Sequence, residues 1–486
     1  MKSDSPYEPV IGLEVHAQLA TRSKIFCGCS TTFGADPNSH ACPVCLGLPG
    51  ALPVLNREAV EFAIRLILAV GGQVSERSVF ARKNYFYPDL PKGYQISQFD
   101  VPIGQGGSVE FVCDLHSAHK VQVGLIRIHL EEDAGKSLHN EDPADDSTLV
   151  DVNRCGVPLL EIVSKPEIRS PRDASLYLQQ MHQILQYLGI CTGNMEEGAL
   201  RCDANVSIRP AGSTVLGTRT ELKNMNSFRA VERALSVEIG RQTELVRDGQ
   251  LIRQETMLWD EKSQTVHPMR SKEESSDYRY FPDPDLLPLQ ISSSWVDSVR
   301  ASLPELPMAR AARLAAQYGI PDYDASVLTE TRELADYYEQ TVAVFTDGKK
   351  ASNWIMTEVL RILKEKSIGI SSFPVRPEHL GQLLATVSDG TISGTAAKTV
   401  FEQMVVTGKS PKDIVTEGGF AQISDGTMLG HLVDRVLDEN QDQVATYRSG
   451  NQRVLAFFVG QVMKNSKGKA NPQRISELLK ERLDRS

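Results

Sequence analysis

Apolar and polar side chains alternate in several short runs within the first 290 residues. In the run 10–19, the apolar side chains of the odd positions alternate with Glu14, His16 and Gln18. Successive side chains of a strand point to opposite faces, so this run predicts a strand with one core face and one polar face. Helical periodicity is confined to 57–70, 171–188 and 227–247. We therefore expect an α+β domain with an antiparallel sheet over residues 1–294.

The pattern becomes helical near Trp295. Apolar residues recur at helical spacing in 308–318, 330–344 and 351–364. The proline-containing stretch 373–377 predicts a linker. Further helical patterns follow it: 377–388, 395–407, 411–417, 425–439, 452–463 and 472–483. We expect three domains: 1–294, a helical domain over 295–372, and an all-α tail domain over 373–486.

The composition is that of an ordinary globular protein. The chain has 486 residues, of which 41% are hydrophobic and 23% charged, and this length is too great for a single core. No apolar run approaches the roughly 20 residues that span a bilayer. The first residues include charged side chains and no apolar run of the kind found in secretion signals. We expect a cytoplasmic protein without membrane contact.

The charge is unevenly distributed along the chain. The net charge is −10, yet the segment 441–486 holds nine basic residues against four acidic ones. A basic tail on an acidic protein favours contact with a polyanion. A charged but merely solvated helical surface is an equally good interpretation of the same residues.

Four of the eight cysteines form two closely spaced pairs. Cys27 and Cys29 are followed after twelve residues by Cys42 and Cys45. Two such pairs in a reduced compartment supply four thiolates to a tetrahedral zinc ion. Because the protein would fill every ligand position, we expect this zinc to be structural rather than catalytic.

Metal-binding and phosphate-binding residue types share the polar faces of several predicted strands. Carboxylates bind hard divalent cations such as Mg²⁺, and arginine recognises phosphate. Phosphoryl transfer depends mainly on positioning and charge neutralisation, which such a face would supply. The alternative is a solvated sheet face. The residues concerned are Glu14, His16, Arg127, His129, Glu131, Glu161, Arg201, Asp203, Asn205, Ser207, Arg209, Arg219, Glu221 and Lys223.

Two loops combine aromatic residues with prolines, lysines and arginines. They occupy residues 84–95 and 277–285. Such rings could stack on a base or ribose, or they could belong to rigid loops packed on the body. The sequence leaves both interpretations open. It also lacks the nucleophile motifs of a glutaminase, so ammonia from glutamine would require another protein.

Several long motifs resemble one family, the B subunits of glutamine-dependent aspartyl/glutamyl-tRNA amidotransferases. The resemblance extends over nearly the whole chain, with one departure at 448–451. The motifs are GLEVHAQ at 12–18, the two cysteine pairs, YPDLPKGYQISQ at 87–98, HLEEDAGK at 129–136, YRYFPDPD at 278–285, VGQVMK at 459–464 and GKANP at 468–472.

The resemblance implies a catalytic cradle domain with a glutamine-synthetase-like sheet, followed by helical and tail domains. It implies that ATP phosphorylates the side-chain carboxylate of misacylated Glu-tRNA(Gln) or Asp-tRNA(Asn), and that ammonia displaces the phosphate. A partner amidase (A) subunit would release the ammonia from glutamine, and a small C subunit would complete a heterotrimer. ATP, Mg²⁺ and a structural Zn²⁺ are the expected cofactors.

The family motifs also suggest roles for individual residues. The expected Mg²⁺ ligands are Glu14, His16, Glu131, Glu132, Asp203 and Glu221. To these we add phosphate or transition-state contacts by Arg201, Arg209 and Lys223, and cofactor binding by Lys136 and Asn205. The expected tRNA contacts of the tail are Arg448, Arg453, Lys464, Lys467 and Lys469.

Two other functions use parts of the same sequence. A stand-alone carboxylate–amine ligase acting on a small molecule would need the charged strands but no basic tail. A non-catalytic, zinc-containing RNA-binding module would need the cysteines and the tail but no acidic strand faces. Formation of Gln-tRNA or Asn-tRNA from misacylated tRNA discriminates all three.

Overall fold

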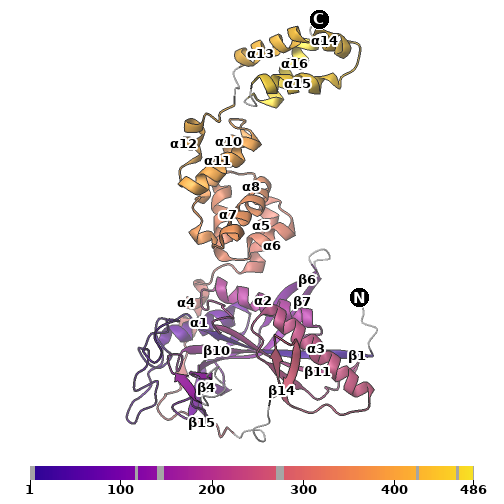
Figure 1. The fold of residues 1–486 in the computed structure, drawn as a ribbon. Helices are drawn as coiled ribbons and strands as arrows, with labels where there is room; N and C mark the ends of the chain where they lie inside the picture. Colours follow the sequence, from indigo (N-terminus) through magenta and orange to yellow (C-terminus); the bar gives the residue numbers. More distant parts are fainter. Residues whose placement is uncertain are drawn as a thin grey trace. The chain divides into compact units, whose positions relative to one another are not determined.

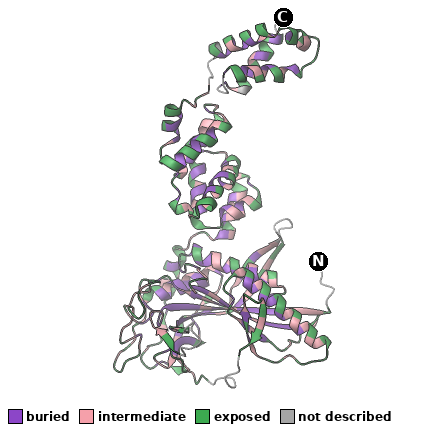
Figure 2. Cartoon of the chain, in the orientation of Figure 1, coloured by how far each residue is buried: buried purple, intermediate pink, exposed green. Residues whose placement is uncertain are grey.

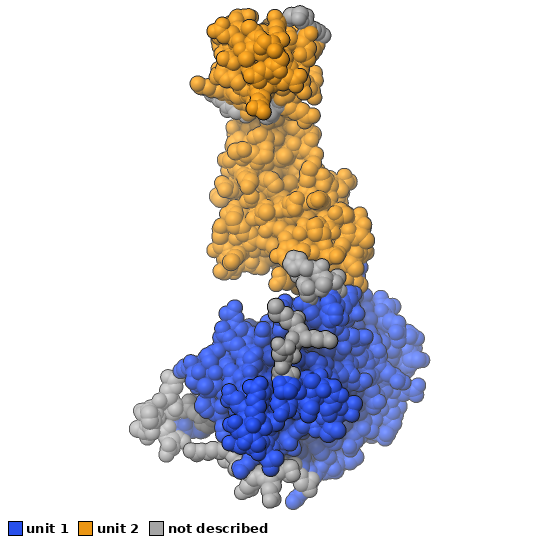
Figure 3. All heavy atoms as spheres, turned by 90° about the vertical axis from the view of Figure 1, so that its right-hand side faces the viewer, with its two compact units in different colours: residues 1–307 blue, residues 308–486 orange. Residues whose placement is uncertain are grey.

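The computed structural model describes residues 6–114, 119–139, 147–269, 278–422, 426–466 and 470–484. The chain divides into two compact units, residues 1–307 and residues 308–486 (Figure 3). The first unit contains a large sheet with helices, and the second consists of helices (Figure 1). The predicted α+β class is confirmed at this level.

Within the described residues, fourteen strands of the first unit form one sheet. Its main path is β14-β13-β12-β11-β1-β10-β7-β4-β3-β15, while β8 pairs with β9 in a separate two-stranded sheet. The strands are β1 (Tyr7–Gln18), β2 (Gln73–Val74), β3 (Arg77–Asn84), β4 (Tyr94–Val101), β5 (Gly104–Gln105), β6 (Ser108–Asp114), β7 (His119–Glu132), β8 (Lys136–His139), β9 (Thr148–Asp151), β10 (Pro158–Ser164), β11 (Leu200–Pro210), β12 (Thr220–Lys223), β13 (Thr256–Asp260), β14 (Thr265–Pro268), β15 (Phe281–Pro282) and β16 (Leu289–Gln290).

The first long strand, β1, lies in the interior of this sheet. It pairs antiparallel with β10 on one side and with β11 on the other. The predicted alternation along β1 is present, because Leu13, Val15 and Ala17 are fully buried while Glu14 and His16 are only partly buried. The core face and the charged face of the sheet are therefore both set by this strand.

Three long helices cover the core face of the sheet. Their N-termini are capped by side chains of Asn56, Ser170 and Ser227, each of which accepts a backbone N–H of the first turn. Helix α1 packs on β7, α2 on β1 and β6, and α3 on β11. Buried residues concentrate between these helices and the sheet (Figure 2). The helices of this unit are α1 (Arg57–Ala69), α2 (Pro171–Tyr187), α3 (Phe228–Arg247) and α4 (Ser293–Ala301).

The sheet is mixed rather than purely antiparallel as predicted. Strand β12 pairs in parallel with β13, whereas β13 pairs antiparallel with β14. The 20-residue helix α3 connects β12 to β13. A connection of this length crosses back over the sheet and starts the next strand in the same direction, which a hairpin turn cannot do.

The described residues of the second unit form two hydrophobic clusters, one within 314–415 and one within 429–483. The linker predicted at 373–377 is wrong, because Phe373 and Val375 are buried in the first cluster, whereas the helix predicted from Pro377 is confirmed. The domain boundaries stay a prediction. The helices are α5 (Pro307–Tyr318), α6 (Asp322–Leu328), α7 (Arg332–Val344), α8 (Gly348–Trp354), η1 (Ile355–Val359), α9 (Leu360–Lys366), η2 (Ile370–Ser372), α10 (Pro377–Ser388), α11 (Gly394–Thr407), α12 (Pro411–Gly418), α13 (Gly426–Glu439), α14 (Gln441–Arg448), α15 (Val454–Asn465) and α16 (Pro472–Asp484).

None of the helices formed by the described residues combines the length and apolar character needed to cross a bilayer.

Candidate active site and cysteine cluster

The register of the sheet brings the charged strand positions into rows. One row joins Arg201 of β11, His16 of β1, Glu161 of β10 and His129 of β7 as direct cross-strand neighbours. Directly opposite side chains on adjacent strands have Cβ atoms about 5 Å apart, so each member of a row can contact the next. Residues that lie far apart in the sequence, such as His16 and Arg201, thereby form one continuous face of the sheet.

Two histidines and two glutamates form the centre of this face. The Nε2 atom of His16 lies 3.5 Å from Oε2 of Glu161 and 4.0 Å from Oε1 of Glu131. His129 approaches the same carboxylates, at 3.5 Å and 3.7 Å. His16, Glu131 and Glu161 each offer a ligand atom, and these atoms lie within 4.8 Å of one another. This geometry fits one hard divalent cation, with coordination positions left for other ligands.

The electrostatics of the centre reflect mutual stabilisation of opposite charges. Burial favours neutral His129, but hydrogen bonds and charges from Glu131 and Glu161 outweigh it and raise its pKa to about 9. The pKa of His16 is raised for the same reasons. Burial opposes ionisation of Glu161, yet its hydrogen bonds to both imidazoles hold its pKa well below the usual range. The two imidazoles and the Glu161 carboxylate therefore stabilise one another's charged forms.

A second group of charges continues the face across β1, β11 and β12. The amide of Asn205 donates to Oε1 of Glu14 at 2.9 Å. The Lys223 ammonium donates to Asp203 at 2.6 Å and lies 3.1 Å from Glu221. Burial and the neighbouring carboxylates, Glu161 first, raise the pKa of Glu14. An acid surrounded by acids in this way gains from a bound cation, which would favour its ionised form.

The side chain of Glu221 is also fixed from β13. The Thr256 hydroxyl donates to Oε2 of Glu221 at 2.8 Å, on the strand that runs parallel to β12. Burial opposes the charge of Lys223, but Asp203 and Glu221 more than offset this and raise its pKa. Lys223 therefore stays positively charged beside the acidic groups, as a phosphate-binding residue must.

The two arginines predicted to bind phosphate are engaged elsewhere. Arg201 donates to Asp133 at 3.0 Å, and the amide of Gln18 donates to the same carboxylate at 2.7 Å. Arg209 donates to Glu8 at 2.6 Å, at the far end of the β1–β11 pair. Arg201 is the β11 member of the central row, whereas Arg209 lies eight residues further along its strand.

Two predicted residues lie apart from the charged face. Glu132 follows Glu131 directly in β7, so it points to the opposite side of the sheet. There its carboxylate accepts from Lys92 and, at 2.8 Å, from the backbone N–H of Ile96. Lys136 is exposed in the separate β8–β9 sheet. Neither residue meets the other predicted ligands.

Sequence reasoning missed three residues that belong to the site. Glu161 and His129 stood out as polar positions in apolar strands, but they were not among the expected ligands, although they form the central row with His16. Asp133 follows the Glu-Glu pair and is the buried partner of Arg201. A carboxylate within an otherwise apolar strand is the signal that would have found Glu161.

A cavity of about 500 Å³ adjoins the charged side chains of β1 and β11. Glu14 and Asn205 stand at its edge, and Ser164 and Arg219 add polar groups to a largely apolar lining. The remaining lining includes Val10, Pro166, Leu216 and Ile126. A space of this size, apolar with a few polar groups, is typical of a small-molecule site.

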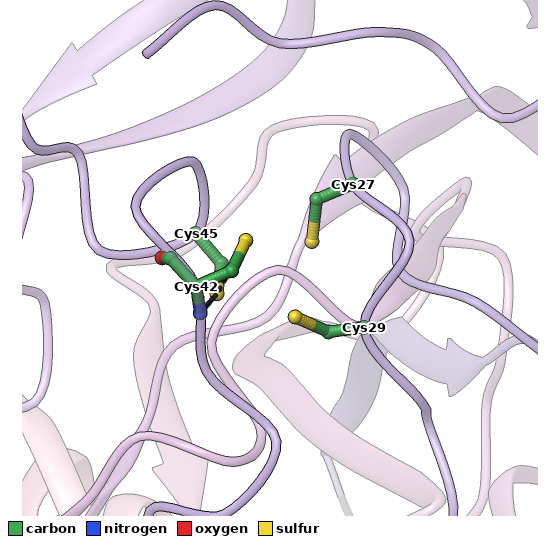
Figure 4. Close-up of side chains that lie close together, drawn as sticks. All are labelled: Cys27, Cys29, Cys42 and Cys45. Atoms are coloured by element: carbon green, nitrogen blue, oxygen red, sulfur yellow. Dashed lines mark hydrogen bonds between the residues drawn. The ribbon is translucent and has the colours of Figure 1, made fainter.

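The four paired cysteines converge in the loops that follow β1. Their sulfur atoms lie within 4.8 Å of one another, with the 27/29 pair on one loop and the 42/45 pair on another (Figure 4). A tetrahedral zinc with Zn–S bonds of about 2.3 Å places sulfurs roughly 3.8 Å apart. The Sγ atoms of Cys42 and Cys45 are 3.8 Å apart. The cluster fits a closed, four-thiolate zinc site.

Neighbouring groups favour thiolate formation in this cluster. The hydrogen bond from Cys27 is the largest influence on Cys45, and with the charge of Lys24 it outweighs burial and lowers the pKa of Cys45 to about 4. Burial and a hydrogen bond to Cys42 raise the pKa of Cys29 to about 11. The cluster thus favours the thiolate form of Cys45 and the protonated form of Cys29. A bound cation would favour the thiolate form of all four cysteines.

Comparison with known proteins identifies the class to which the sheet and its charged face belong. Residues 9–297 match the family model described as the GatB/GatE catalytic domain, and residues 336–483 match the GatB domain. These two matches cover the strands of the charged face, the cysteine cluster and most of the helical unit.

Full-length relatives define the family more narrowly. The chain is 56% identical over 478 residues to the B subunit of the aspartyl/glutamyl-tRNA(Asn/Gln) amidotransferase of Geobacter sp. (strain M21), covering 98% of this chain and 99% of the relative. It is 53% identical to the B subunit of the same enzyme from Moorella thermoacetica, with 98% and 100% covered. The chain belongs to the family of aspartyl/glutamyl-tRNA(Asn/Gln) amidotransferase B subunits.

Proposed function

We propose that this protein catalyses the ATP-dependent amidation of glutamate or aspartate attached to a noncognate tRNA, giving Gln-tRNA(Gln) or Asn-tRNA(Asn). The observation that carries this proposal is the charged face, which lies on the family's catalytic domain and joins candidate acidic metal ligands to Lys223, a partly exposed lysine held by Asp203. A non-catalytic zinc module has no use for such a face. This argues against the RNA-binding alternative.

The chemistry has two balanced steps. The side-chain carboxylate attacks the γ-phosphorus of ATP, and the bond to ADP breaks, which leaves an acyl phosphate. Ammonia then attacks the acyl carbon, the bond to phosphate breaks, and the nitrogen loses a proton to give the amide. The first step brings two anions together and the second expels an anionic phosphate, so neutralisation of charge is the main task of the protein.

The residues of the charged face divide this task. His16, Glu131 and Glu161 would hold a Mg²⁺ ion, with Glu14, Asp203 and Glu221 as further carboxylates nearby. When bound, Mg²⁺ would neutralise phosphate charge. Lys223 would hold a phosphate oxygen, with Asp203 and Glu221 keeping it protonated. The cavity beside Glu14 and Asn205 would hold the nucleotide.

The ammonia must come from elsewhere, because the sequence contains no recognisable glutaminase. The relatives are each named as one lettered subunit of an amidotransferase, which indicates an assembly of several chains. We propose that an amidase (A) subunit releases ammonia from glutamine and that a small C subunit completes the heterotrimer. The cysteine cluster would bind zinc and fix the loops after β1. The glutamine-synthetase-like sheet and the three-domain division belong to the same proposal.

The stand-alone ligase and the amidotransferase differ in their substrate. The complex, supplied with ATP, Mg²⁺, ammonia and misacylated tRNA, should form Gln-tRNA or Asn-tRNA. Free glutamate or aspartate offered in place of the tRNA tests the ligase alternative. Amidation of the free amino acid, with no product on tRNA, would overturn the proposal.

The tail is proposed to hold the tRNA. Arg448 ends α14, Arg453 precedes α15 and Lys464 lies in its last turn, and all three are exposed. Lys467 and Lys469 lie outside the described residues. Phosphate contacts make binding salt-dependent, with a slope of about 0.7 to 0.9 per contact in a double-logarithmic plot.

We predict that a complex truncated after Glu439 binds tRNA more weakly and with a smaller salt slope than the full complex. Its affinity for ATP should be unchanged, because the charged face lies wholly within residues 1–307. Binding measured at two salt concentrations checks this. Equal tRNA affinity for both complexes would place recognition elsewhere.

A further inference from the structure

Five aromatic rings make continuous contact at one end of the sheet. Phe99 of β4 stacks on Tyr280, with centroids 4.3 Å apart and planes 11° apart. The other three contacts are edge-to-face. Tyr280 contacts Tyr278, with ring centroids 6.1 Å apart, and Tyr278 contacts Tyr85 at 6.0 Å. Tyr85 in turn contacts Tyr87 at 5.8 Å. We call these five residues the aromatic ladder. It joins the two aromatic loops whose role the sequence left open.

Two cations lie against the ladder. The Arg127 guanidinium lies 5.1 Å from the centroid of Phe99, and the Lys83 ammonium lies 4.7 Å from that of Tyr278. Cations over aromatic faces are favourable in themselves, and they also supply positive charge for phosphates between stacked bases. The Nε atom of Arg127 is buried and has no hydrogen-bond partner among the described residues.

The ladder lies on the same side of the sheet as the proposed metal ligands. Ser97 pairs with Glu131, and Phe99, two residues further along β4, lies against Arg127, which shares the face of His129 and Glu131 on β7. Lys83 pairs with Gln95, which places it and the ladder's Tyr85 on that face as well. Arg127 connects the two regions, because it contacts Phe99 and lies 3.8 Å from Glu161.

Several rungs of the ladder remain open to solvent. Phe99 is 40% exposed, Tyr87 59% and Tyr278 36%. Exposed aromatic rings with adjacent cations, beside a site that acts on tRNA, are typical of surfaces that bind unpaired nucleotides.

We propose that the aromatic ladder stacks the unpaired bases at the 3′ end of the tRNA substrate. This inference rests on the proposed function. The reacting carboxyl is joined to the terminal ribose by only a few bonds, so the last bases must lie next to the metal ligands. Five rings in a row accommodate more than one base, which suits an RNA end better than the single base of ATP.

The test compares Phe99→Leu, Tyr278→Leu and wild type in the whole complex with partner subunits and misacylated tRNA. Loss of one stacked base should raise the KM for tRNA about 5- to 100-fold. The kcat and the KM for ATP should remain unchanged. Phe33→Leu, which removes a 68% exposed ring from another loop, is the control and should behave like wild type.

A second substrate separates stacking from a merely structural role. Wild type should bind misacylated tRNA more weakly when the last nucleotide of that tRNA lacks its base. A ladder variant should lose much less affinity for the same altered tRNA, because both changes remove the same stacking interaction. Additive losses, an unchanged KM for tRNA, or a raised KM for ATP would overturn the inference. If wild type fails to amidate tRNA at all, the proposed function itself fails.

Discussion

Among the described residues of the first unit, two groups of side chains could each hold a metal ion, and they differ in construction. The cysteine cluster draws four sulfurs from positions 27 to 45, on two loops. The group of His16, Glu131 and Glu161 draws one nitrogen and two carboxylates from three strands of the sheet. The cysteine cluster offers soft sulfur ligands that fill all four positions of a tetrahedral metal ion. The second group offers harder ligands and leaves coordination positions of its cation open.

This difference separates a structural role from a chemical one. A closed set of ligands leaves no place for substrate, so metal binding there stabilises the loops. An open set on a rigid sheet can share its cation with phosphate oxygens. The same unit thus combines a metal that would hold the fold with one that would take part in the reaction.

The largest expected effect is at the open site. Glu161→Gln and Glu14→Gln each remove a charge from the metal-binding face while preserving side-chain shape. We expect the rate of amidation at ordinary Mg²⁺ to fall about 100- to 1000-fold, because the alignment of the phosphates is lost. Single-turnover assays with thermal unfolding of the same samples check this.

Glu110→Gln is the matched control for these variants. Glu110 pairs with Lys120 at 2.8 Å on the exposed β6–β7 hairpin, away from the site. It should retain full activity. Near-normal turnover of Glu161→Gln would show that the charged face is only a solvated surface.

An intermediate effect is expected at the closed site. The Cys42→Ser, Cys45→Ser double variant should lose its zinc and about 4 kcal/mol or more of stability, a size of change that loss of a metal produces. Metal analysis and thermal unfolding measure both quantities. The control variant Cys113→Ser, which lies outside the cluster, should contain as much zinc as wild type. Equal zinc in the double variant and wild type would refute the assignment.

The smallest effect sharpens the open site further. Thr256→Val removes the hydroxyl that donates to Glu221 at 2.8 Å, but leaves Lys223 in place. One such hydrogen bond contributes about 1 kcal/mol, so we expect a change of roughly fivefold in Mg²⁺ dependence. Thr265→Val on the exposed neighbouring strand should change nothing. A loss as large as that of Glu161→Gln would contradict this ranking.

Local patterns in the sequence predicted the elements better than their arrangement. Alternation located β1 and β11, and the serine before Pro171 marked the start of α2. The cysteine spacing located its cluster because both pairs are close in sequence. Strand order is set by packing over the whole unit, so the placement of Glu161 between His16 and His129 was not accessible.

Two predictions failed for different reasons. Glu131 and Glu132 are adjacent in one strand, and alternation alone excludes both from the same face, so that rule was available but was not applied to the neighbouring residue. The helix predicted to begin at Pro377 is confirmed as α10. The preceding residues were interpreted as a linker because their local pattern does not reveal the packing that buries Phe373 and Val375.

The interior position of β1 also affects how the protein is made. This strand is synthesised well before its two partners, which begin at Pro158 and Leu200. At 5–20 residues per second, translation reaches them on the order of ten seconds later. Until then both edges of a strand with one apolar face are unpaired, and unpaired edges promote aggregation. Nascent chains that end before β11 should therefore depend on chaperones, and the charged face is complete only after β12 is synthesised.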